Sequence, residues 1–167
     1  MTTSIVARGL DQCVELLRAV SPDDLQRPTP CSEWTVADLS DHIVNSTAGM
    51  ATMAHGGAPD WANAAHHDDP ATVLEAEGRA LVDALAGSDS FPTGMAAAEL
   101  AVHAYDLATA LGRDTAGLDP EVAETGLEFM SASMKPEMRG DAFGPEQPAP
   151  EGADVYRRLA AFAGRTV

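Results

Sequence analysis

The clearest helical signal in this chain lies in residues 95–111, which read MAAAELAVHAYDLATAL. Small and apolar side chains fill this run except at Glu99, His103, Asp106 and Thr109. At about 100° per residue, the first three of these polar side chains fall within an arc of roughly 60° on one helical face. A carboxylate and an imidazole, both common metal ligands, therefore point the same way one turn apart. The alternative is that this stripe is the solvent-facing side of an amphipathic helix.

The composition favours one all-α domain. A chain of 167 residues has the length of a single ordinary domain, so residues 1–167 are expected to fold as one unit. Hydrophobic residues make up 45% of the chain and aromatic residues only 5%, and alanine is abundant among the former. This balance suits closely packed helices better than a β-sandwich built on aromatic and branched side chains.

The charge of the chain argues against several partners. Asp and Glu number 26 against 10 Lys and Arg, which gives a net charge of -16. Such a field repels phosphate backbones and anionic membrane surfaces, so neither nucleic acid nor a membrane is expected as a partner. The chain has no basic and apolar leader and no apolar run near the roughly 18 residues that span a bilayer, which predicts a soluble, cytoplasmic protein. Cys13 and Cys31 do not indicate a disulfide framework, and neither is assigned a catalytic role.

Apolar residues spaced three and four apart predict six helices. The predicted helices cover residues 3–20, 36–54, 70–86, 93–111, 120–134 and 154–164. The predicted connectors are the Pro-containing residues 21–34, a polar crossover at 55–69 and an ordered loop at 135–152. Thr93 is expected to cap the fourth helix and Gly112 to end it in a left-handed conformation. Four helices with one long crossover, plus additional C-terminal helices, predict a four-helix bundle, an architecture that builds metal sites from facing helices.

A third candidate metal ligand is His42, which borders the apolar face of the second helix. A histidine in this position is often a structural residue, but Glu99 and His103 on a neighbouring helix would complete a His-His-carboxylate set. Such a set leaves coordination positions open, as in catalytic zinc and iron sites. Asp106 is a candidate to orient the His103 ring or to handle a substrate proton, and an exposed helix aspartate is the alternative. Asp38 is explained more simply as a helix cap than as a ligand.

Other polar and aromatic residues receive structural interpretations. Trp34 is expected to pack against the start of the second helix. His66 and His67 are expected to lie in a solvated turn, because adjacent histidines do not readily face one metal ion. His55 is expected to be exposed near a helix end.

Three motifs, taken in order, resemble one known family. They are PTPCSEWTVADLSDHI at residues 28–43, ELAVHAYDL at 99–107, and a tail with RGxxFGP at 139–145 followed by RLxxFxGR at 158–165. This pattern is similar to the DinB/YfiT-like superfamily, and within it to actinobacterial proteins related to the N-terminal domain of mycothiol-dependent maleylpyruvate isomerase. One lysine against nine arginines fits a GC-rich, actinobacterial source. The isomerase has an additional C-terminal domain that this chain lacks, so maleylpyruvate isomerisation itself is not expected.

The resemblance implies a DinB-like four-helix bundle that binds a divalent metal, zinc or nickel, through His42, Glu99 and His103. It also implies a thiol-dependent reaction, since such proteins use mycothiol, bacillithiol or glutathione. The function expected here is S-transfer from mycothiol to a small electrophile. Arg139 is a candidate to hold a substrate carboxylate or a developing oxyanion, and the alternative is a surface arginine that pairs with the excess acidic residues. The alternatives are a metal-dependent small-molecule hydrolase and a non-catalytic protein that binds a metal or a small molecule. The sequence leaves open whether two bundles pair as a homodimer.

Overall fold

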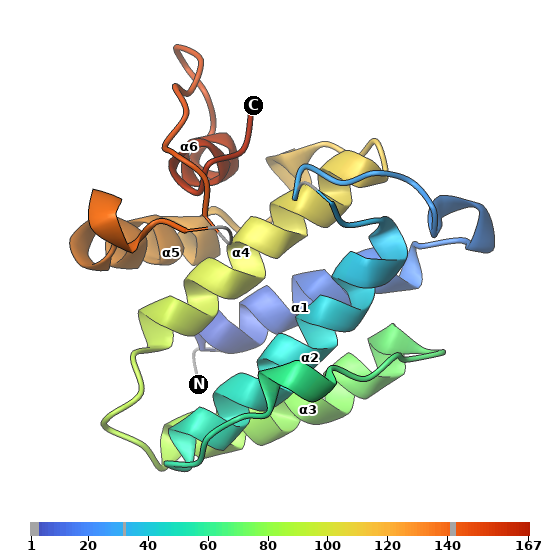
Figure 1. Ribbon diagram of the computed structural model, residues 1–167, viewed down its shortest axis with the longest axis vertical. Helices are drawn as coiled ribbons and strands as arrows, with labels where there is room; N and C mark the ends of the chain where they lie inside the picture. The colour runs from blue at the N-terminus through green and yellow to red at the C-terminus, as the bar shows by residue number, and fades with distance from the viewer. Residues whose placement is uncertain (1–3, 32, 141–142) are drawn as a thin grey trace.

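The structure, a computed structural model, describes residues 4–31, 33–140 and 143–167, and over these ranges the protein is all-α and contains no strand, as predicted (Figure 1). The helices are α1 (Ile5–Arg18), α2 (Val36–Ala54), α3 (Pro70–Ala86), α4 (Thr93–Ala110), α5 (Pro120–Ser133) and α6 (Val155–Phe162). Their bounds agree with the predicted segments to within about two residues. The fold is consistent with the DinB-like bundle that the resemblance implies.

The long crossover between α2 and α3 runs back along α2. The Trp61 ring lies against Gly49, and the Asn45 side chain exchanges hydrogen bonds with the backbone of Ala65. Further along, the Asp41 carboxylate accepts hydrogen bonds from the backbone N–H of His67. The crossover therefore returns the chain to the N-terminal half of α2, and α3 packs beside α2 in the same direction (Figure 1).

Helix α4 lies at the centre of the molecule, in contact with α1, α2, α5 and α6 (Figure 1). Its alanines allow this crowding, because small side chains let neighbouring backbones approach closely. The polar stripe of α4 is not its wet side: His103 is 5% exposed and Asp106 is fully buried. The amphipathic alternative for this helix is therefore wrong. Although α4 is the most apolar helix, no helix in the described ranges is long and apolar enough to cross a membrane.

Most helix ends follow the predicted signals. Thr35 and Asp38 form a reciprocal capping box at the start of α2, which confirms the capping role of Asp38. Gly112 ends α4 with a φ of 67°. One prediction is wrong: Thr93 is the first helical residue of α4 and not its cap. The cap position belongs to Pro92, whose extended backbone (φ -74°, ψ 111°) begins the helix with no side-chain hydrogen bond.

The contact between α4 and α5 depends on a glycine. A Cβ atom at Gly126 would lie 2.7 Å from the Ala98 Cα atom, which belongs to the backbone of α4. We predict that Gly126→Ala lowers the free energy of unfolding by about 1–3 kcal/mol, because separating two packed helices costs more than alanine's helix propensity gains. Urea unfolding followed by circular dichroism measures the change.

Gly117→Ala is the control for this prediction, since a Cβ atom there would meet nothing within 4 Å. Equal stability of Gly126→Ala and the wild type would contradict the close-contact interpretation.

Candidate metal centre

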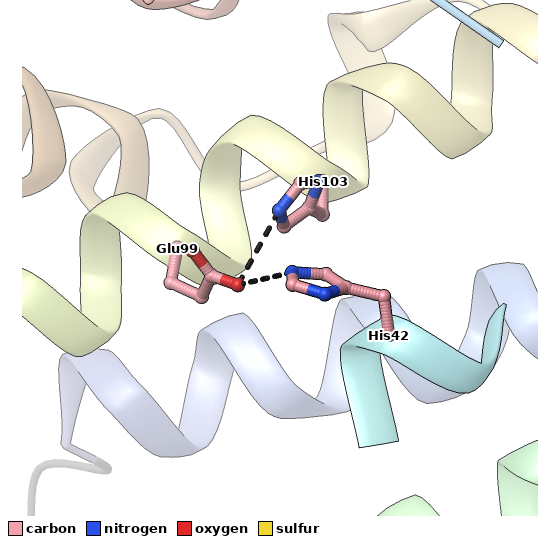
Figure 2. Close-up of side chains that lie close together, drawn as sticks. All are labelled: His42, Glu99 and His103. Atoms are coloured by element: carbon pink, nitrogen blue, oxygen red, sulfur yellow. Dashed lines mark hydrogen bonds and ion pairs between the residues drawn. The ribbon is translucent and has the colours of Figure 1, made fainter. Parts of the chain in front are cut away.

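Three predicted ligands come together between α2 and α4. His42 projects from α2, and Glu99 and His103 project from successive turns of α4 (Figure 2). The Glu99 Oε1 atom lies 2.8 Å from His42 Nε2 and 3.3 Å from His103 Nε2. One ligand atom from each residue lies within 4.8 Å of the other two. The two imidazole edges therefore converge on one carboxylate oxygen.

The donor set fits a divalent transition metal. In a tetrahedral zinc site with metal–ligand distances of about 2.0–2.2 Å, ligand atoms are separated by roughly 3.3–3.6 Å. The 3.3 Å separation of Glu99 and His103 already has this value, and the 2.8 Å separation of Glu99 and His42 requires only a small rotation. Two imidazoles and one carboxylate suit zinc, nickel or iron, and three protein ligands leave positions for small molecules.

A second set of residues holds the His103 ring from behind. The His103 Nδ1 atom lies 3.1 Å from Asp106 Oδ2, so the opposite ring nitrogen is turned toward Glu99. The Arg165 guanidinium donates to both Asp106 oxygens, from Nη2 at 2.9 Å and from Nε at 3.2 Å. Asp106 therefore has the geometry to orient the His103 ring, which is one of the two roles predicted for it. Arg165 was assigned no role from the sequence, where only its place in the family-like tail marked it.

These charges shift one another's pKa values. Partial burial acts to raise the pKa of Glu99, but the adjacent His103 and His42 imidazoles outweigh burial and hold it well below its usual range. Burial acts to lower the pKa of His103, but Glu99 and Asp106 outweigh burial and raise it to about 9. The pKa of Asp106 is lowered, since its bonds to His103 and Arg165 overcome its burial. With no metal bound, His103 is thus protonated at neutral pH, with an acceptor at each ring nitrogen.

Trp34 covers the outer side of the cluster. Its ring centroid lies 4.3 Å from that of His42 and 6.0 Å from that of His103. The residue before it, Glu33, has a left-handed φ of 79°, an uncommon conformation for a non-glycine residue. The sequence predicted that Trp34 packs against the start of α2, but no sequence pattern indicated its contact with the candidate ligands. Burial raises the pKa of the nearby Cys31 thiol, which agrees with assigning it no catalytic role.

Arg139 is engaged in the C-terminal loop. Its Nη1 atom donates to the backbone carbonyls of Gly144 and Phe162, and its guanidinium lies over the Phe162 ring at 4.8 Å. Within the described residues it lines none of the three cavities that reach the candidate ligands. Its contacts favour a loop-holding role over the predicted contact with substrate.

The other histidines stay away from the cluster. The His66 Nδ1 atom lies 2.8 Å from an Asp41 oxygen, and the His67 ring lies 3.2 Å from Asn45. Both belong to the crossover, as expected for a turn. His55 is exposed at the C-terminal end of α2.

Two cavities are lined by both His42 and Glu99, and a third, of about 630 Å³, is lined by His42 but not by Glu99 or His103. Of the first two, one, of about 580 Å³, is almost wholly apolar, and the other, of about 470 Å³, is more polar and contains Arg165. His42, Glu99 and Phe143 line both. A metal ion held by the cluster would therefore be open to small molecules from two sides of different polarity.

A helical bundle with a partly buried His-His-Glu cluster between two cavities defines a class of candidate metal-binding bundle proteins. Residues 6–90 match the family described as Mycothiol maleylpyruvate isomerase N-terminal domain, and this chain belongs to that family. Two relatives are the uncharacterized proteins MT0763 and Rv0738 of Mycobacterium tuberculosis, from strains CDC 1551 and H37Rv. Each is 34% identical over 176 residues, which cover 96% of this chain and 95% of the relative. No solved structure matches the chain.

The ligand set makes a direct prediction about metal content. We expect protein purified with zinc to hold about one ion per chain, and His42→Ala to hold almost none, because two remaining ligands bind zinc weakly. Elemental analysis by mass spectrometry measures the stoichiometry. His55→Ala, at an exposed histidine of the same helix, is the control and should keep its metal. Full occupancy in His42→Ala would show that the ligand set is wrong.

The raised pKa of His103 predicts that metal binding depends on pH. Metal binds neutral imidazole, so below pH 9 an incoming ion must displace the proton that Glu99 and Asp106 hold on the ring. The apparent affinity should therefore fall by up to about tenfold for each pH unit lowered from 9 toward 6. Competition with a chromogenic chelator measures the slope.

Calorimetry in buffers of different ionisation enthalpy should detect about one proton released per ion at neutral pH. Glu99 adds nothing to this slope, because its lowered pKa keeps it ionised. An affinity that is constant from about pH 6 to pH 8.5 would contradict the charge state assigned to His103.

Proposed function

We propose that this protein is a divalent-metal-dependent S-transferase that joins a low-molecular-weight thiol to a small electrophile. The observation that carries the proposal is the convergence of His42, Glu99 and His103 at the meeting point of two cavities. Two substrates could then approach one metal from different sides. Mycothiol, the thiol in the name of the family, is the proposed co-substrate.

In this proposal His42, Glu99 and His103 hold the metal ion. Zinc is the proposed metal, and nickel is the alternative. A divalent ion held there would lower the pKa of a thiol at the site and so make a thiolate available near neutral pH. The transfer itself is simple to balance. The thiol loses its proton to water, its sulfur forms a bond to the electrophilic carbon, and the leaving group departs with the electrons of the broken bond.

The neighbouring residues have positioning roles. Asp106 would keep the His103 ring in one orientation with its Nε2 atom toward the ion, and Arg165 would keep Asp106 ionised and fixed. We assign Arg139 to holding the loop that carries Phe143, since its hydrogen bonds are made to loop and helix carbonyls. The proposed location is the cytoplasm, where low-molecular-weight thiols are kept reduced.

The test is product formation with a defined thiol. Zinc-loaded protein is mixed with mycothiol and a panel of alkyl and aryl halides, and thioether products are followed by mass spectrometry. We expect wild type and His55→Ala to form thioether at equal rates. His42→Ala and the chelator-treated wild type should fall to the rate of the mixture without protein.

Two other results would replace the proposal. Turnover of esters or amides without any thiol would favour a metal-dependent hydrolase. Stoichiometric metal with neither thioether nor hydrolysis product would favour a binding protein.

Competition with a chromogenic chelator tests the positioning role of Asp106. Asp106→Asn keeps the shape of the side chain but removes the charge, so the affinity for zinc should fall about 10–100-fold. The variant should also unfold at a lower temperature, because the buried Arg165 loses its charged partner, so the affinity is compared at a temperature where circular dichroism shows both proteins folded. An unchanged zinc affinity would contradict the role.

A further inference from the structure

The apolar cavity of about 580 Å³ is lined by nearly all the methionines of the chain. It lies among α2, α4, α5 and the C-terminal loop, and six of the seven methionines in the sequence line it. These are Met50, Met53, Met95, Met130, Met134 and Met138. Methionine side chains are flexible and polarisable, so surfaces rich in them adapt to ligands of different shape. Such a concentration in one cavity exceeds what filling gaps in a core requires.

The cavity begins at the candidate metal ligands. On α2 the residues that line it are His42, Ser46, Met50 and Met53, a single helical face that leads away from the imidazole. On α4 it is lined by Met95, Ala98, Glu99 and Val102, again one face that includes a candidate ligand. The apolar cavity and the cluster are therefore parts of one site. A volume of about 580 Å³ is in the range of small-molecule sites.

Beyond His42, the described residues that line the cavity offer no group that would pair with an anionic substrate. Among the described residues, the only titratable side chains lining the cavity are His42 and Glu99, both at its metal end. The Ser46 hydroxyl donates to the Ile43 carbonyl of its own helix. A carboxylate or phosphate placed beyond His42 would lose its hydration without gaining a partner. The net charge of -16 would repel it further.

The outer edge of the cavity is apolar and open. Trp61 is 57% exposed, Met138 is 66% exposed and Met95 is 38% exposed, and all three line it. The Trp61 ring packs against Gly49 of α2, where a Cβ atom would lie 2.2 Å from the Cη2 atom of Trp61. Large apolar groups left in water around a cavity are typical of a ligand entrance.

From this geometry we infer that the electrophile is an uncharged apolar molecule, aromatic or aliphatic, which binds in the methionine-lined cavity with its reactive carbon toward His42 and Glu99. The inference deepens the proposed function, and it rests on that function only in calling the bound molecule an electrophile. The binding of an uncharged apolar molecule in this cavity stands without it.

The experiment uses two fluorescent probes with the same aromatic rings. N-phenyl-1-naphthylamine is uncharged, and 8-anilino-1-naphthalenesulfonate carries a sulfonate on the same skeleton. Each is titrated into zinc-loaded and into chelator-treated protein without thiol. We expect the uncharged probe to bind at one site per chain, at least tenfold more tightly than the sulfonate.

Matched variants locate the binding site. Met95 and Leu25 are equally exposed, at 38%, but only Met95 lines the cavity. Met95→Glu should weaken binding of the uncharged probe at least tenfold, and Leu25→Glu should leave it unchanged. Met138→Glu, at the more exposed loop position, is the second variant should the first fold poorly. Equal affinity for the two probes, or equal binding by the Met95→Glu and Leu25→Glu variants, would overturn the inference.

The remaining outcomes separate this inference from the proposed function. Sedimentation that shows a dimer dissociated by Met95→Glu and Met138→Glu, with no probe binding, would make the patch a contact between two copies and overturn the inference. If the probe binds as expected but benzyl chloride and mycothiol give no thioether, only the transferase fails. If thioether forms, benzyl chloride should react with at least tenfold higher kcat/KM than 4-(chloromethyl)benzoate, and the reverse preference would overturn the inference.

Discussion

A continuous chain of charged and polar contacts, from Arg165 through Asp106 and His103 to Glu99 and His42, is the constraint on which the centre of this molecule depends. Helix α4 is surrounded by four other helices, so the polar groups on its buried face are largely removed from water. Buried charges are tolerated only when they are paired and hydrogen-bonded. Each group in this series has a hydrogen-bonding or oppositely charged partner, which lets an alanine-rich helix be buried while it carries candidate metal ligands.

Local sequence rules were sufficient for most of the fold. The helix bounds followed from apolar spacing and from capping residues such as Thr35 and Gly112, because these signals act within one turn of the chain. The spacing of Glu99, His103 and Asp106 also fixed their common face, but not what that face packs against. Helical periodicity gives only the angle at which each side chain leaves the helix axis, not the element that the side chain contacts. That the stripe turns inward is decided by α2 and α6, which lie far from it in the sequence.

The parts of the site that escaped prediction depend on distant contacts. Arg165 is 59 residues from Asp106, and no local pattern relates an arginine in a tail to an aspartate in a central helix. Trp34 reaches His42 by a turn whose residue Glu33 has an unusual φ. The methionine cavity is similar, because its walls come from three helices, the crossover between α2 and α3, and the C-terminal loop.

The division of the site between segments affects what family membership implies. The family match covers residues 6–90 and so contains His42, whereas Glu99, His103 and Asp106 lie on α4 beyond it. The relatives align over almost the whole chain, so the fold they share extends through α4 and α6. The candidate metal site is therefore defined by the geometry of α2 against α4, whereas the thiol of the proposed function is taken from the name of the family. Since His103 is held by a residue that Arg165 holds in turn, the C-terminal segment belongs to the site as much as the matched region does.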